Sequence, residues 1–178
     1  MKLSSSLPLA LFLILAGCSK PAPEETFKKA EDAMKAGNYP LALETFAEVI
    51  SDHPGSVLAE QAAFRIAATQ HNEMHDYQAA VAAYQRYVEL YPDGQKAPTA
   101  LFLTGFLYNN ELHKLDSAAL AYRRFLEKYP HHEMALSAQF ELDNLGKSPD
   151  ELLPKPPVTK EPASKAPAKK GAGKNKKG

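Results

Sequence analysis

Two histidines at helical spacing are the first residues in this sequence whose side chains could bind a metal. His71 and His75 stand four residues apart, with Glu73 between them. This pattern suits a divalent metal if one helix carries both rings. We expect instead that these residues lie in a link between two helices, where histidines are normally solvated. The sequence therefore predicts no metal site.

The patterns of catalytic sites are also incomplete. His132 and Glu133 begin like a zinc-protease motif, but Leu136 stands where the second metal-binding histidine is required. The chain has no glycine-rich phosphate loop and no recognisable pairing of nucleophile and base. We predict that the protein is not an enzyme, with no catalytic residues and no dissociable cofactor.

Cys18 is the only cysteine, so its thiol cannot form an intrachain disulfide. It follows an apolar run at 7–15, which is too short for a membrane span of about 20 residues and is typical of a signal peptide. The sequence Leu15-Ala16-Gly17-Cys18 resembles a bacterial lipobox. The resemblance implies removal of 1–17, diacylglycerol and an N-acyl chain on Cys18, and a lipidated linker at 18–23. An ordinary signal peptide with an incidental cysteine is the alternative.

Ser19 follows the cysteine. By resemblance to the sorting rule of enterobacterial lipoproteins, a residue other than Asp favours the outer membrane over the inner membrane. We therefore expect a lipid-anchored protein of the cell envelope, on the periplasmic face of the outer membrane.

Zero net charge conceals two regions of opposite sign. Residues 155–178 hold eight Lys and one Glu, a charge of +7, whereas residues 19–154 hold twelve Lys plus Arg and twenty Asp plus Glu, a charge of −8. The Lys/Pro/Ala-rich tail, 147–178, has little to bury and is predicted to be disordered. It could contact peptidoglycan weakly or serve only as a solubilising segment. The acidic body argues against nucleic acid as a partner.

Between these ends the chain repeats itself with a period of 38 residues, which is typical of a helical solenoid. Small residues, aromatic residues and prolines recur in register: Ala42, Ala80 and Ala118; Phe46, Tyr84 and Tyr122; Pro54, Pro92 and Pro130. The spacing of alanine and ring places them on one helical face, and each proline prevents the helix from continuing. Asn38 and Asp76 stand where a side chain can cap the start of that helix.

A second series of aromatic residues precedes these helices. It consists of Phe27, Phe64, Phe102 and Phe140, and small residues follow the first three at Ala30, Ala67 and Gly105. Each unit is therefore predicted to be a pair of helices. The fourth phenylalanine indicates another first helix without a partner, at 132–146, where Asp143 replaces the small residue as in a terminal cap facing water.

The pattern of Gly37, Tyr39, Ala42, Phe46 and Pro54 resembles the tetratricopeptide repeat. The implied fold is an all-α solenoid at 24–146, with about three repeats, near 24–55, 56–93 and 94–131, plus the C-terminal capping helix. The second and third repeats have a longer link between their helices. The lipobox and the Tyr-Pro repeat ends are similar to BamD-like lipoproteins of outer-membrane barrel assembly, and to the Tol-Pal-associated repeat protein.

By this resemblance the first helices line a concave surface that binds partner proteins. The implied partner-binding residues include Phe27 and, as the main candidates, Phe64, Arg65, Phe102, Phe106, Asn109 and Asn110. The competing interpretation is that the phenylalanines are core between stacked helices. Three functions remain open: an envelope scaffold that docks on a complex such as the barrel-assembly machinery, a cell-wall or division-linked adaptor, and an enzyme or ligand receptor, for which no site is found.

The lipid anchor gives the first testable prediction. Labelled palmitate should enter the protein, and Cys18→Ala should abolish the label and release the domain from the membrane or leave it uncleaved. Label that persists in the Cys18→Ala variant would show that Cys18 is not the acylated residue.

Overall fold

A computed structural model describes residues 20–147 and Glu151. The signal peptide, Cys18 and nearly all of the basic tail lie outside the described residues. Within residues 20–147 there are seven helices and no strand. They are α1 (Pro23–Lys35), α2 (Tyr39–Asp52), α3 (Val57–Asn72), α4 (Tyr77–Leu90), α5 (Ala97–Asn110), α6 (Leu115–Lys128) and α7 (Ala135–Asp143). None of these helices has the length and hydrophobicity needed to cross a membrane.

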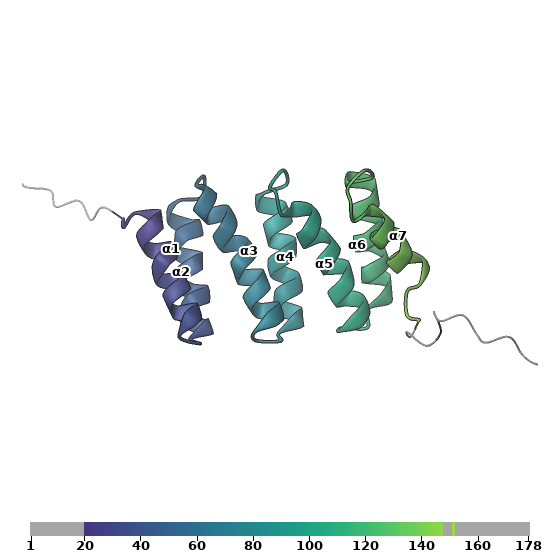
Figure 1. The fold of residues 1–178 in the computed structure, drawn as a ribbon, viewed down its shortest axis with the longest axis horizontal. Helices are drawn as coiled ribbons and strands as arrows, with labels where there is room; N and C mark the ends of the chain where they lie inside the picture. Colours follow the sequence, from purple (N-terminus) through teal and green to yellow (C-terminus); the bar gives the residue numbers. More distant parts are fainter. Residues whose placement is uncertain (1–19, 148–150, 152–178) are drawn as a thin grey trace, which may run out of the picture. The chain divides into compact units, whose positions relative to one another are not determined.

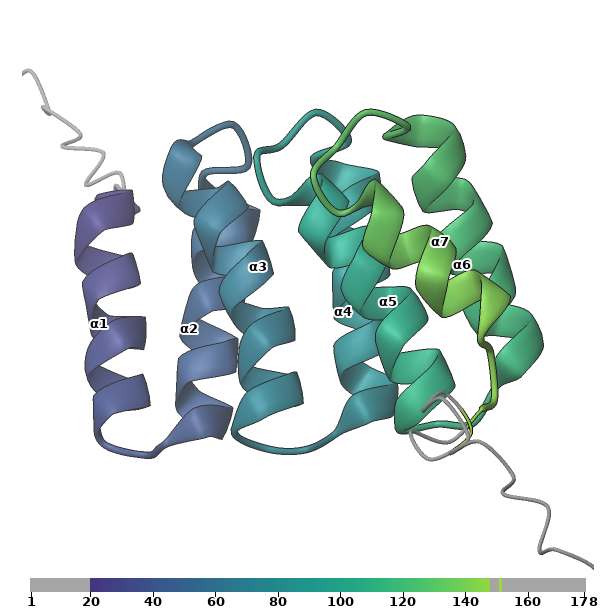
Figure 2. The same ribbon diagram turned by 45° about the vertical axis from the view of Figure 1, so that its right-hand side comes forward.

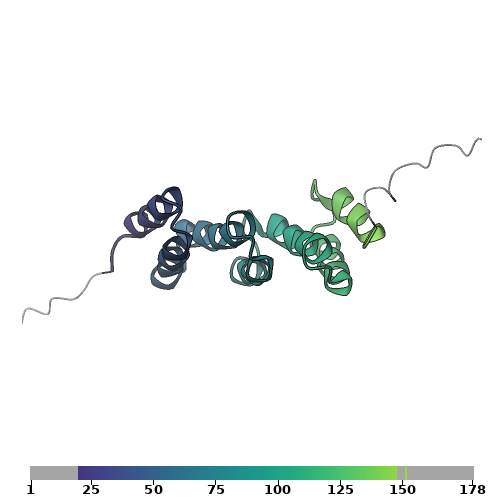
Figure 3. The same ribbon diagram turned by 90° about the horizontal axis from the view of Figure 1, so that it is seen from below.

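The helices form three antiparallel pairs, α1–α2, α3–α4 and α5–α6, and α7 packs on α6 (Figure 1). The first helices of the pairs lie in one row and the second helices in another (Figure 3). Each second helix ends two residues before a proline, at Asp52, Leu90 and Lys128. Proline at these positions thus marks the boundary of every pair, as the repeat predicted.

Side-chain caps fix where the helices begin. Asn38 Oδ1 accepts a hydrogen bond from the Leu41 N–H at 3.3 Å, and Asp76 Oδ1 accepts one from the Ala79 N–H at 3.0 Å. Both predicted caps are confirmed. Such a cap satisfies a backbone donor that has no partner inside the helix, and its loss typically costs about 1 kcal/mol.

The longer link of the second and third repeats is only one residue longer. The first pair is joined by 36–38, and the later pairs by 73–76 and 111–114. A residue with positive φ makes each turn: Gly37 at 72°, His75 at 53° and His113 at 52°. The extra residue is absorbed in a wider turn, in which the Asp76 N–H bonds the Gln70 carbonyl six residues back. Our placement of His71 in the link was therefore wrong, because α3 continues to Asn72.

Aromatic rings fill the space inside each pair. Phe27 packs edge-on against Phe46 at 5.2 Å between ring centroids, and Phe64 packs in the same way against Tyr84 at 5.6 Å. The third pair repeats the contact with Phe102 and Tyr122 at 5.6 Å. The second-helix alanines, Ala42, Ala80 and Ala118, are fully buried beside these rings. The phenylalanines are therefore largely core, and such ring pairs add about 0.5–1.5 kcal/mol to the burial of their area.

Gly105 has no side chain because a ring occupies the space. A Cβ atom at this position would lie 2.8 Å from the Tyr122 Cε1 atom. In the third pair the ring of Tyr122 therefore requires glycine at this position of α5.

The middle pair gives a prediction about stability. Tyr84 is 1% exposed, and burial raises the pKa of its phenol to about 12. Tyr84→Ala should lower the free energy of unfolding by about 3–5 kcal/mol, because it leaves a large cavity between α3 and α4. Chemical denaturation followed by circular dichroism measures this loss. Leu120→Ala, at a side chain that is 68% exposed, is the control and should unfold like the parent. A Tyr84→Ala protein as stable as the parent would contradict the assigned register.

Candidate partner-binding surface

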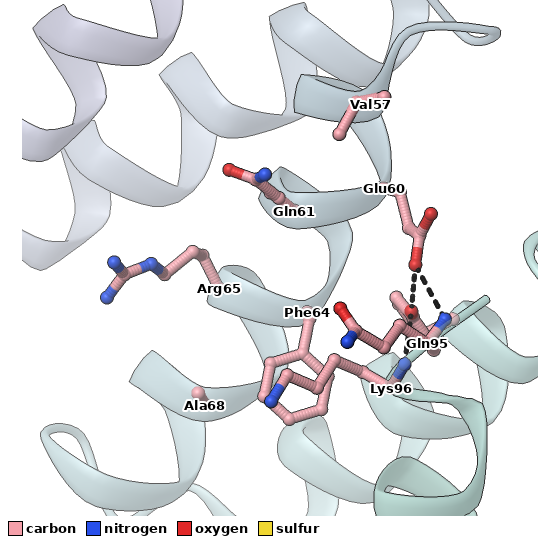
Figure 4. Close-up of a pocket in the computed structure, with 9 residues that line it drawn as sticks. Val57, Glu60, Gln61, Phe64, Arg65, Ala68, Gln95 and Lys96 are labelled. Carbon is pink, nitrogen blue, oxygen red and sulfur yellow. Dashed lines mark hydrogen bonds between the residues drawn. The ribbon is translucent and has the colours of Figure 1, made fainter.

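The largest pocket near a predicted binding residue lies beside α3. It has a volume of about 440 Å³ and opens where α3 faces the turn that precedes α5 (Figure 4). Phe64 and Arg65, two of the predicted binding residues, lie on its wall. Its other lining residues are Val57, Glu60, Gln61, Ala68, Tyr87, Gln95 and Lys96.

Glu60 forms a fixed part of this wall. Its Oε1 atom accepts hydrogen bonds from the Tyr87 hydroxyl at 2.7 Å and from the Gln95 N–H at 3.1 Å. The Tyr87 oxygen in turn accepts the Lys96 N–H at 3.2 Å. Burial, and then the hydrogen bond to Glu60, raise the pKa of Tyr87 well above its ordinary value. The Glu60 carboxylate on α3 therefore contacts both α4, at Tyr87, and the turn before α5, at Gln95.

The turn beside Glu60 requires glycine. A Cβ atom on Gly94 would lie 2.7 Å from both the Glu60 Oε1 atom and the Tyr87 hydroxyl. Any side chain here would separate the carboxylate from its donors. Gly94 therefore permits the contact between the second and third helix pairs, besides following the proline that ends α4.

Two cations flank the apolar part of the pocket. The Arg65 side chain is 56% exposed, and its ion pair with Glu31 is long, at 3.7 Å, so it contributes little. Lys96 makes no ion pair with any residue that the structure describes. Ala68 and the ring of Phe64, which is only partly buried, line the same pocket, and the Lys96 side chain overlaps the ring in the view of Figure 4. The pocket can therefore hold an apolar side chain with acidic groups on either side.

Comparison with known families identifies the chain. The family described as YfiO, outer membrane lipoprotein, matches residues 20–148. The chain belongs to the YfiO family. Members of this family are non-enzymatic protein-interaction scaffolds, so the prediction that the chain is not an enzyme is confirmed. Membership also places the protein in the cell envelope.

A solved structure shares the fold, and a second is reported beside it. A tetratricopeptide repeat protein from Parabacteroides merdae is 22% identical, with a TM-score of 0.53, over 67% of this chain and 45% of that one. The tetratricopeptide repeat domain of Arabidopsis OM64 is 20% identical, with a TM-score of 0.49, over 68% of this chain and 94% of that one. The all-α tetratricopeptide-repeat solenoid with a capping helix is thus confirmed. The chain spans less than half of the first structure, and no curated protein matches it.

The remaining predicted binding residues of this YfiO-family chain do not share the pocket. Phe102 packs against Tyr122, and Phe106 lies partly buried on the same helix, α5. Asn109 Oδ1 accepts the Gly146 N–H at 3.2 Å, and Asn110 Nδ2 donates to the Phe106 carbonyl at 3.1 Å. Both asparagines thus make hydrogen bonds within the fold. Among the main predicted binding residues, only Phe64 and Arg65 line this pocket.

Gln95 and Lys96, on the far side of the pocket, are not among the binding residues that the sequence predicts. They follow Pro92 at the boundary between two repeats. The sequence signal that could have indicated them is the short segment between Pro92 and the start of the next first helix, α5. A turn this short must lie against the preceding first helix, α3.

His71 and His75, which the sequence places at helical spacing, belong to no group of possible metal ligands among the described residues. His71 lies in the last turn of α3 and packs against Tyr77 and Tyr84, and His75 lies in the turn beyond and packs against Tyr77. Burial is the main cause that lowers the pKa of His71. The two rings therefore contact a tyrosine of α4 and support the turn.

Glu60 provides a prediction for this surface. Glu60→Ala should leave the Gln95 N–H and the Tyr87 hydroxyl without their acceptor and lower the free energy of unfolding by about 1–3 kcal/mol. Hydrogen exchange at the Gln95 and Lys96 amides should become faster. Gln61→Ala, at the exposed neighbouring position in the same pocket, is the control. Unchanged exchange at 95 and 96 in Glu60→Ala would show that the carboxylate does not hold this turn.

Proposed function

We propose that this protein is a lipid-anchored scaffold on the periplasmic face of the outer membrane, which binds partner proteins through the pocket around Phe64 and contributes to outer-membrane protein assembly. Membership of an outer membrane lipoprotein family and the lipobox at Cys18 support the location. The pocket with two cations around an apolar ring is the observation that carries the binding role.

The anchor would hold the first repeat close to the membrane. Only residues 19–22 separate Cys18 from the start of α1, a reach on the order of 13 Å at full extension. The linker is also tied to α2, because Lys20 Nζ lies 2.8 Å from Asp52 Oδ1 and His53 Nε2 lies 2.9 Å from the Pro21 carbonyl. These contacts are exposed and contribute little energy, but they direct the linker along the first pair.

The proposed ligand is a segment of an envelope protein with an apolar side chain flanked by carboxylates. The apolar side chain would cover the exposed part of the Phe64 ring, and burial of that area supplies most of the affinity. Acidic groups on the segment would pair with Arg65 and Lys96. Glu60 does not compete for these cations, because its Oε1 atom already accepts two hydrogen bonds within the wall.

Reversal of the two cations tests the proposal. Arg65→Glu with Lys96→Glu should lower recovery of barrel-assembly components from detergent-solubilised envelopes at least tenfold, as measured by quantitative mass spectrometry. The control is Lys29→Glu with Arg123→Glu, which makes the same charge change at exposed positions outside the pocket. Circular dichroism should show both proteins folded.

Two results would contradict this function. Equal recovery with the pocket variant and the control would exclude the pocket as the docking site. Recovery of cell-wall or division proteins alone, with no barrel-assembly component, would favour the adaptor function in its place.

A further inference from the structure

A second pocket is lined by residues of α4, α5 and α6, and α5 packs on both of the other helices (Figure 2). Its volume is about 210 Å³. The floor consists of the buried side chains of Val88, Leu101, Thr104 and Ala121. The Thr104 hydroxyl donates a hydrogen bond to the Ala100 carbonyl at 2.9 Å, so this floor offers mainly apolar surface.

Helical periodicity separates this pocket from the one around Phe64. Leu101, Thr104 and Tyr108 recur at i, i+3 and i+7 on one face of α5, whereas Phe102 and Phe106 lie on another face. The two pockets share no lining residue. The second pocket is therefore a separate feature of the array.

The pocket extends along the contact between α5 and α6. Because these helices are antiparallel around the turn at 111–114, Leu101 lies level with Arg124, and Tyr108 lies level with Ser117. The distance from Leu101 to Tyr108 is about 10 Å along a helix. Small-molecule sites usually exceed roughly 300 Å³, so this smaller pocket suits one large side chain.

Arg124 is the one charged residue that lines the pocket. It is exposed and makes no ion pair with any residue that the structure describes. Arg86, one period earlier on α4, pairs with Glu89 at 3.6 Å. Glu127 stands in register with Glu89, yet Arg124 does not pair with it. The Arg124 guanidinium is therefore available to a carboxylate at one end of the pocket.

Leu120 forms the rim of the pocket one turn before Arg124. Its side chain is 68% exposed, whereas the equivalent residue of α4 is the smaller Ala82. The hydroxyls of Tyr108 and Ser117, at the other end, make no hydrogen bond with any described residue. The pocket thus combines an exposed leucine and an apolar floor with polar groups that have no partner.

We infer that this pocket is a second docking site for an acidic segment of another protein. The segment places one aliphatic or aromatic side chain over Leu101 and Thr104, and an Asp or Glu beside Arg124. Burial of the apolar side chain against Leu120 supplies most of the affinity. The unpaired guanidinium selects a carboxylate and disfavours a basic segment, because a like charge here would repel it. The site does not depend on the pocket around Phe64.

Two small molecules with the same ring and opposite charge test the pocket in the mature full-length protein in detergent. In methyl NMR, 3-phenylpropionate should shift the resonances of Val88, Leu101 and Leu120 about fivefold more than 3-phenylpropylamine at equal concentration. Ligands of this size bind weakly, so the titration extends to about 10 mM. Equal shifts from the acid and the amine, or no shift of these methyl groups, would overturn the inference.

Protein variants assign the charge preference to one residue. Arg124→Glu should reverse the preference, so that the amine gives the larger shifts. Arg123→Glu makes the same charge change at an exposed neighbour outside the pocket and should leave the preference for the acid unchanged. The Arg65→Glu, Lys96→Glu protein should also keep it, which separates this site from the Phe64 pocket. A preference for the acid that survives Arg124→Glu would overturn the inference.

Crosslinking in cells tests the occupant. A photoreactive phenylalanine analogue at position 120 should crosslink to an envelope protein, at a segment with Asp or Glu within one helical turn of the crosslinked residue. Arg124→Glu should reduce this product about tenfold, and Arg123→Glu should not. A product formed only with lipid or with a second copy of this chain, or at a segment without an acidic residue, would overturn the assignment of the occupant.

Discussion

The close packing of two helices around an aromatic ring is the contact on which the whole array depends. Within each pair a fully buried alanine of the second helix is followed one turn later by a buried ring, as with Ala80 and Tyr84. Small residues allow the backbones to approach, and the rings fill the volume beyond the crossing. Gly105 shows the limit of this arrangement, since even one methyl group would meet the ring of Tyr122.

The pairs are joined by a different kind of contact. In the middle of the array Glu60 accepts hydrogen bonds from Tyr87 and from the backbone before α5, so one carboxylate connects three consecutive helices. This directional contact fixes the turn after Pro92 against α3. Apolar packing alone is less selective about position, whereas a buried hydroxyl must meet its acceptor. The pocket wall is thereby held in place by the same residues that join two repeats.

Apolar side chains reach the surface at more than one place in the array. The pocket on α3 combines the Phe64 ring with the cations of Arg65 and Lys96. In the described part of the chain, α7 exposes Leu136 and Phe140. The pocket around Phe64 agrees with the proposed role of this YfiO-family chain as a protein-binding scaffold.

The sequence by itself determined the repeat. Its period, its prolines and its caps at Asn38 and Asp76 are local signals, because each depends on residues within one or two turns of a helix. Only the tertiary structure decided which residues form a surface. Lys96 lines the Phe64 pocket across a repeat boundary, Asn109 bonds the Gly146 N–H, and α3 continues past His71 to Asn72. A periodic sequence aligns equivalent positions, but contacts between different positions of neighbouring repeats depend on how the helices pack.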